Sequence, residues 1–263
     1  MAKAKATDVA DPKTGDIVAV DMLADMGADI EAGLGQKFAT DDLIIPRITI
    51  LQDLSPQTKE RKAEYVPGAK PGVIFNSVNN ALEDFITFVP AKFHTAWVAW
   101  KPRPEGGLVN NDVDPKILTE ANGFMSDGID QFVGHMANHD GEMVKVEVIK
   151  TPEWVGMARG ADGWTMPVAI SFPKTAAKAS RKMNTSIDLT EVTLADGRII
   201  TPPPFYHTFL LGAAIESSGE NEWFGWTVTH EGYAGTDPRM LEKARDIRKS
   251  LEDGTATVAD QEA

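Results

Sequence analysis

The most constraining feature of the sequence is an apolar run that leads directly into a group of cations, within residues 166–184. Residues 167–172 (PVAISF) have the composition of a buried strand, and Pro173 ends that strand because it has no N–H for a sheet ladder. A strand followed by a cationic helix, in an acidic chain, favours either a solvated helix face or a contact with a polyanion. The cations are spaced to share one helix face: Lys174, Lys178, Arg181 and Lys182.

Negative charge is concentrated at the two ends of this 263-residue chain. Residues 1–43 carry four lysines and nine acidic residues, and residues 251–263 carry four acidic residues and no basic one, out of a net charge of −13. The total charge therefore says little about the surface of the middle, where a local basic patch can still bind nucleic acid. The sequence predicts three parts: a flexible acidic arm (1–42), a core (43–236), and a C-terminal helix with an acidic tail (237–263).

Composition excludes several classes of site. The chain has no cysteine, so disulfides, thiolate metal sites and thiol nucleophiles are ruled out. No apolar run approaches the roughly 20 residues of a membrane helix, and the first residues lack the apolar stretch of a secretory signal. We expect a soluble protein that works inside a cell, without membrane contact.

Short apolar segments rich in β-branched and aromatic residues recur between turn signals. A strand at residues 85–89 is expected to stop at Pro90, and Asp196-Gly197 indicates a hairpin turn. A helix is expected over residues 238–251, where apolar residues recur at a spacing of three to four. The pattern predicts a mainly β, β-rich α+β fold: a barrel or sandwich with long insertions, including residues 103–143, and a C-terminal helix.

Aromatic residues alternate with cations in one predicted strand. Trp97 and Trp100 lie between Lys92 on one side and Lys101 and Arg103 on the other. On a regular strand the two indoles point to opposite faces, so one of them should be exposed. Trp100 is expected to stack on unpaired bases, which contributes ~1–3 kcal/mol per base. The remaining indoles are expected in the core: Trp154, Trp164, Trp223 and Trp226.

Support for catalysis is weak. His135 and His139 are four residues apart beside Asp140, which leaves a metal-dependent hydrolase as one alternative. The phosphate-loop, nucleophile-elbow and dinucleotide patterns are absent. We therefore expect no enzyme activity and no metal.

Three segments resemble a group of tailed-phage proteins that bind single-stranded DNA and have an OB-fold core. The first runs from Ile45-Pro46-Arg47 through Leu54-Ser55-Pro56 to residues 70–76 (KPGVIFN), the second is residues 180–185 (SRKMNT), and the third joins residues 203–207 (PPFYH) to residues 223–226 (WFGW). The resemblance implies an OB barrel, a cytoplasmic role in phage DNA replication or recombination (in the host cytoplasm if a phage encodes the chain), and no cofactor. The acidic end looks like the tails with which such proteins recruit replication partners.

Together these features predict a sequence-nonspecific single-stranded DNA-binding protein. An alternative is a virion-associated or other protein-interaction β-protein without nucleic acid, and a homo-oligomer is left open. The residues predicted to contact DNA are Lys59, Arg61, Lys62, Lys92, Trp97, Trp100, Lys101, Arg103, Lys174, Lys178, Arg181, Lys182 and Tyr206.

Overall fold

The computed structural model describes residues 44–102, 105–128, 130–233, 237–254 and 256–258. The chain divides into two units, residues 1–42 and residues 43–263. The elements of the fold lie in the second unit. No helix among the described residues is long and apolar enough to cross a membrane.

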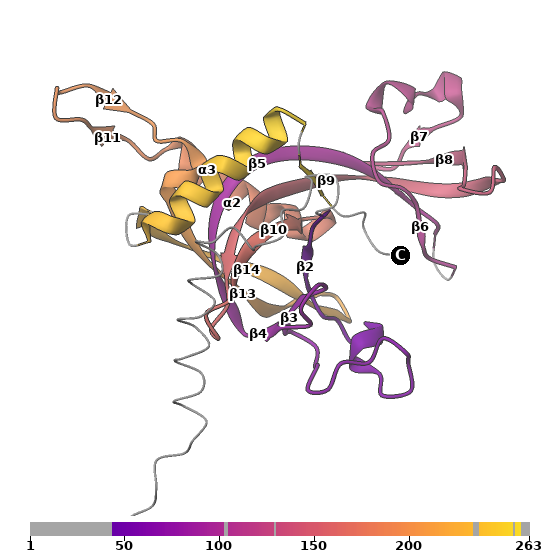
Figure 1. Ribbon diagram of the computed structural model, residues 1–263. Helices are drawn as coiled ribbons and strands as arrows, with labels where there is room; N and C mark the ends of the chain where they lie inside the picture. The colour runs from indigo at the N-terminus through magenta and orange to yellow at the C-terminus, as the bar shows by residue number, and fades with distance from the viewer. Residues whose placement is uncertain (1–43, 103–104, 129, 234–236, 255, 259–263) are drawn as a thin grey trace, which may run out of the picture. The chain divides into compact units, whose positions relative to one another are not determined.

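The second unit is built on one large antiparallel-rich sheet with the strand order β14-β13-β5-β9-β10-β2-β3-β4. Figure 1 shows that the sheet curls into a half-barrel. The bounds of these strands are β2 (Arg47–Ile50), β3 (Ile74–Asn76), β4 (Leu82–Glu83), β5 (Phe85–Trp100), β9 (Met143–Arg159), β10 (Thr165–Ser171), β13 (His207–Ser218) and β14 (Asn221–Tyr233).

Two helices cover opposite faces of this sheet. Helix α2 (Ala177–Asp188) packs Met183 against the face that carries Trp154 and Ile170. Helix α3 (Pro238–Glu252), which crosses the sheet in Figure 1, packs on the face that carries Val155 and Met157. Successive residues of β9 alternate between these faces, as the pleat of a strand requires. The predicted β-rich α+β fold with an OB-like curled sheet and a C-terminal helix is confirmed.

Two expectations at prolines and helix ends were wrong. Strand β5 continues through Pro90, because the ladder with β9 has an irregularity between Pro90 and Lys92 that accommodates a residue without an N–H. The cationic segment is not one helix either. It begins with the 3₁₀ turn η5 (Lys174–Ala176), where Lys174 has φ of +50°, and only then enters α2.

The long insertion is ordered around a core of its own. Strand β5 also pairs with β6 (Leu108–Asn110), and β9 also pairs with β8 (Gln131–Ala137). Strand β7 (Met125–Ser126) pairs with β8. Phe124, Val146 and Val148 are buried there, and the insertion also contains the short turns η3 (Pro115–Ile117) and η4 (Glu120–Asn122). This insertion arm lies at the far right of Figure 1.

Smaller elements complete the fold. The turn η2 (Pro56–Thr58) follows β2, and η6 (Pro204–Tyr206) precedes β13. The hairpin of β11 (Val192–Thr193) and β12 (Ile199–Ile200) is confirmed and projects away from the sheet at the upper left of Figure 1. Strands β1 (Ile44–Ile45) and β15 (Thr257–Val258) pair in parallel, which holds the two ends of the described chain together.

Candidate nucleic-acid interface

The two sides of the curled sheet meet along a seam between β2 and β14. Gln52, just after β2, donates from Nε2 to the carbonyl oxygen of Phe224 at 2.9 Å. Its Oε1 accepts from the backbone N–H of Phe224, also at 2.9 Å. No β2–β14 ladder occurs in the sheet order of the described strands. At this point the side-chain amide of Gln52 therefore links the two strands in place of a backbone ladder.

A second side chain bonds to the same edge of β14. Lys182, from α2, donates from Nζ to the carbonyl oxygen of Val228. Phe224 and Val228 lie four residues apart on the strand, so both of these backbone groups face away from β13. Side-chain caps of this kind protect an edge strand from pairing with other chains. The predicted phosphate contact Lys182 therefore already has a structural role.

A cavity of about 550 Å³ lies along the seam, and we call it the seam cavity. This volume is within the range of roughly 300–1,000 Å³ typical of small-molecule sites. Its polar lining includes Arg47, Gln52 and Ser171. Its aromatic lining comes from β3, β5 and β14: Phe75, Trp100, Trp223, Phe224 and Trp226.

The ring of Phe224 is held by a close approach of the turn before β3. Gly72 has φ of +86°, and a Cβ at this position would lie 2.5 Å from the Phe224 ring. Only glycine fits both the left-handed backbone and the contact. The turn signal Pro71-Gly72 thus also positions an aromatic wall of the cavity.

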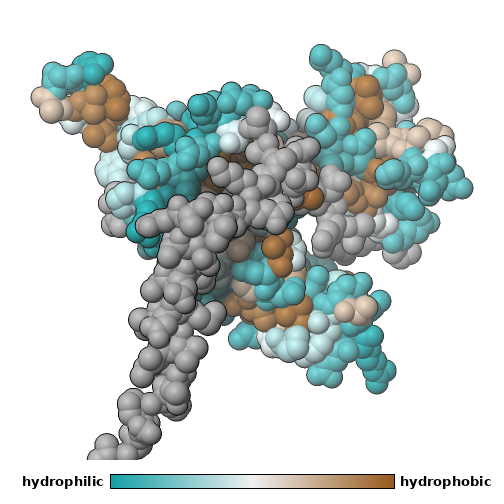
Figure 2. Space-filling model, viewed as in Figure 1, coloured by the Kyte–Doolittle hydropathy of each residue, from teal (hydrophilic) through white to brown (hydrophobic). Residues whose placement is uncertain are grey.

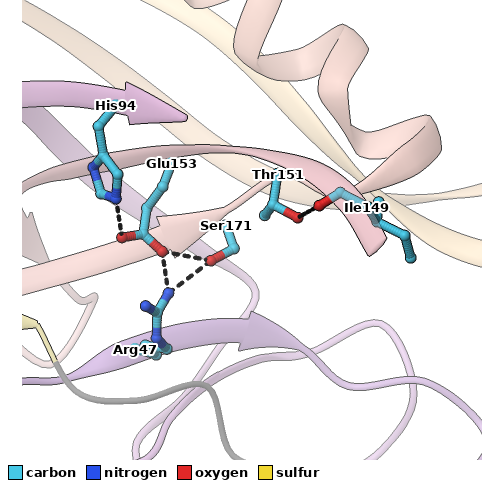
Figure 3. Close-up of polar contacts among 6 residues, drawn as sticks. All are labelled: Arg47, His94, Ile149, Thr151, Glu153 and Ser171. Atoms are coloured by element: carbon cyan, nitrogen blue, oxygen red, sulfur yellow. Dashed lines mark hydrogen bonds and ion pairs between the residues drawn. The ribbon is translucent and has the colours of Figure 1, made fainter. Parts of the chain in front are cut away.

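Buried ionic contacts fix Arg47 in the cavity wall (Figure 3). Glu153 on β9 pairs with His94 of β5 on one side and with Ser171 of β10 on the other. Its carboxylate contacts the Arg47 guanidinium, accepts from the Ser171 hydroxyl at 2.7 Å, and lies 3.1 Å from His94 Nε2. Arg47 also donates to Ser171 Oγ at 2.7 Å. The arginine is therefore held from two directions.

The environment of Glu153 keeps this carboxylate ionised. Burial acts to raise its pKa, but the hydrogen bond with His94, the charge of Arg47 and the hydrogen bonds from Arg47 and Ser171 together lower the pKa to about 2. Glu153 is 1% exposed, so its charge is well shielded from water. The ionised carboxylate balances Arg47, and the cavity wall is rigid and close to neutral at this point.

The structure places some predicted residues around the cavity and others elsewhere. Trp100 lines the cavity, and Lys101 follows it. The loop that carries Lys59, Arg61 and Lys62 also supplies the lining residues Pro56 and Gln57, and all three cations are exposed. Arg103 lies outside the described residues.

The cations of the η5–α2 segment are mostly engaged within the protein. Lys174 lies 3.6 Å from Glu147, although it is next to the lining residue Thr175, and Lys178 lies 2.8 Å from Glu216. Arg181 is exposed and has no recorded partner among the residues that the structure describes. These cations therefore do not form the single free cationic face that helical spacing suggested.

Three further predicted residues lie away from the cavity lining. Lys92 donates to the carbonyl oxygen of Leu251 at 3.0 Å, at the end of α3. Trp97 packs on Phe132 in the insertion arm, with ring centroids 5.5 Å apart. Tyr206 is 37% exposed, and its hydroxyl accepts from Arg245 at 3.4 Å.

Sequence reasoning missed much of the cavity. Trp223 was expected in the core, yet it lines the cavity, and its buried Nε1 has no hydrogen-bond partner in the described part of the chain. Two charged residues in the sequence could have indicated part of the cavity wall. Arg47 and Glu153 both interrupt segments that are otherwise apolar, and buried charges in strands must find partners.

The alternative metal site is not assembled. Among the described residues, no three His, Asp or Glu side chains come together in a way that could hold a metal ion. His135 lies on β8 with an exposed side chain, and Asp140 lies in the turn that follows, where its N–H donates to Asn138.

Comparison with known protein families gives a match. The family model described as Pam3 phage gp34-like protein matches residues 13–257, nearly the whole chain. No curated protein and no solved structure matches.

Proposed function

The chain belongs to the Pam3 phage gp34-like protein family, and from this premise we propose that it binds single-stranded DNA without sequence preference and supports phage DNA replication or recombination. The observation that carries the proposal is the seam cavity, where Trp100 of β5 and the adjacent Trp223 and Phe224 of β14 line one concave site. Unpaired bases stack on such rings whatever their identity, because every base has a π-face.

The electrostatics fit a weakly salt-dependent form of this binding. Four cations near the cavity have no recorded acidic partner among the described residues: Lys59, Arg61, Lys62 and Lys101. Each phosphate neutralised on a single strand contributes about −0.7 to the slope of log K against log salt, so four contacts give a slope of about −3.

Tryptophan fluorescence provides the test. Titration of the full chain with an oligo(dT) strand at low salt should quench the emission, and repeating it at rising salt should give the shallow slope. The same oligonucleotide annealed to its complement is the control and should bind much more weakly, since its bases are already stacked and paired. Absence of any binding to the single strand at low salt would contradict the proposal.

A protein-interaction role is the second candidate, and the β11–β12 hairpin favours it. Ile199 is 64% exposed and the preceding Leu189 is 74% exposed. Figure 2 shows the apolar surface of this hairpin at the upper left. Exposed apolar patches often mark protein contacts. Co-purification with capsid components, without affinity for oligonucleotides, would support this function in place of DNA binding.

A further inference from the structure

The backbone of Trp226 faces the seam. In an antiparallel strand the N–H and C=O groups of alternate residues point to the same edge. Phe224 and Val228 use this outer edge, since they bond to Gln52 and Lys182, and the β13–β14 ladder is regular between them. Trp226 lies midway, so its N–H and C=O point to that edge too, within a segment that lines the seam cavity.

No partner for these two Trp226 groups is recorded across the seam in the described part of the chain. Trp226 is 8% exposed as a residue, and its indole packs on Phe172 with ring centroids 5.9 Å apart, so this segment of β14 is buried. Buried backbone donors and acceptors are nearly always satisfied by protein, water or ligand. The seam therefore offers an adjacent donor and acceptor between aromatic walls.

Gln52 shows which chemistry fits this edge. Its carboxamide presents a donor and an acceptor side by side, and both bond to Phe224. The Watson–Crick edge of a nucleobase has the same pattern: N3–H beside O4 in thymine, N6–H beside N1 in adenine, N1–H beside O6 in guanine, and N4–H beside N3 in cytosine. Phe224 and Trp226 are about 7 Å apart along the strand, so a base at Trp226 would lie next to the Gln52 amide.

We propose that the seam binds the Watson–Crick edge of one unpaired nucleobase on the backbone N–H and C=O of Trp226. The inference rests on the proposed binding of single-stranded DNA and specifies which backbone groups of that site contact the base. Since all four bases carry the adjacent donor and acceptor, the contact imposes no strong sequence preference. Duplex DNA is excluded, because pairing already occupies these edges.

Modified oligonucleotides test the contact without altering the protein, which matters because replacing Trp226 would disturb the core. The full chain is titrated with oligo(dT), with an oligonucleotide of N3-methylthymine, and with oligo(dU). The N3-methyl group blocks the Watson–Crick edge but leaves the ring able to stack. Uracil lacks only the 5-methyl group and keeps the edge, so it is the matched control.

We expect the N3-methylated strand to bind about tenfold more weakly or worse, since loss of the edge contact leaves a buried donor and acceptor unpaired. Oligo(dU) should bind within about threefold of oligo(dT), because it loses only one methyl contact. Equal binding of N3-methylated and unmodified strands would overturn the edge contact and leave single-strand binding intact. If none of the strands binds, the proposed function fails, and this inference fails with it.

Discussion

Single residues show why the chemistry of the seam could be predicted only in part. Trp100 is singled out because cations flank it in sequence. Of these, Lys101 follows it at the cavity, whereas Lys92 bonds to Leu251 at the end of α3. Arg47 and Glu153 are 106 positions apart, and they meet because β2, β10 and β9 are neighbours in the sheet. A charged residue inside an apolar run indicates that a partner exists, but sequence spacing does not say which one.

Trp100 and Trp97 form a matched pair for testing the role of stacking. Trp100→Ala should weaken binding of oligo(dT) by about 5- to 150-fold, the equivalent of one lost stack. Trp97→Ala should leave affinity nearly unchanged but lower the unfolding midpoint, because Trp97 packs in the insertion arm. Fluorescence anisotropy of a labelled strand measures the first effect, and urea denaturation the second. Equal losses of affinity in both variants would argue against a special role for Trp100.

The buried carboxylate predicts how stability depends on pH. Glu153 has a folded-state pKa of about 2 against 4.5 for an ordinary glutamate, so the folded protein favours its ionised form. Its contribution is complete above pH 4.5 and is lost as pH falls toward 2, on the order of 3 kcal/mol in all. Urea midpoints measured between about pH 6 and pH 3 should therefore decrease.

Glu153→Gln should remove much of that acid sensitivity. It should also destabilise the protein at neutral pH by roughly 3–5 kcal/mol, because Arg47 would remain buried without its counter-charge. Glu142→Gln, at an exposed position in a turn, is the control and should change neither property. An unaltered acid transition in Glu153→Gln would show that other groups dominate it.

Elements were predicted more reliably than their ends. Apolar strand segments, the Asp196-Gly197 hairpin and helix α3 follow from local patterns, and all are present. The errors arose where tertiary contacts override local rules: β5 passes through Pro90 at an irregularity, and the cationic segment begins with the turn η5 before it enters α2. The sequence also does not reveal that the insertion builds a separate core.

The turn that holds Phe224 can be tested with two glycines of similar backbone conformation. Gly72 has φ of +86° and contacts the Phe224 ring, whereas Gly141 has φ of +81° and a Cβ added there would meet nothing within 4 Å. Both Gly→Ala changes destabilise the folded protein, because each places an alanine on a left-handed backbone. Only Gly72→Ala also displaces Phe224, so it should be less stable by about a further 1–3 kcal/mol.

Urea midpoints and oligonucleotide affinity together check this prediction. We expect weaker DNA binding in Gly72→Ala, because the ring it moves lines the seam cavity, and unchanged binding in Gly141→Ala. If the two variants lose equal stability and both bind DNA normally, the turn does not position the cavity wall.

At the scale of the whole molecule, the seam depends on which strands become neighbours. Gln52 and Phe224 are 172 positions apart, and no local signal predicts their contact. They meet because the successive strand pairings from β14 to β2 curl the sheet. The same curl separates predicted residues that looked alike in sequence, since Trp100 reaches the cavity while Trp97 reaches the insertion arm. Recruitment of replication proteins through the acidic tail stays a prediction.

Charge at the chain ends gives the last prediction, and the structure decides where the tail should be cut. Residues 257–258 pair with β1, and Leu251 and Val258 pack near Ile45. A deletion from residue 251 would therefore remove packing as well as charge. A deletion of 259–263 together with 1–42 removes net charges of −2 and −5 and leaves these contacts in place.

This double truncation should tighten oligo(dT) binding at low salt, because fewer negative charges repel the phosphates. The gain should shrink toward zero near 0.15 M salt, where the screening length is about 8 Å. Titrations of both proteins at matched salt concentrations measure it, and a truncation of 251–263 is expected to lower the unfolding midpoint as well. A gain that persists at high salt would instead indicate that the removed segments block the site by direct contact, and no gain at any salt would show that their charge does not influence binding.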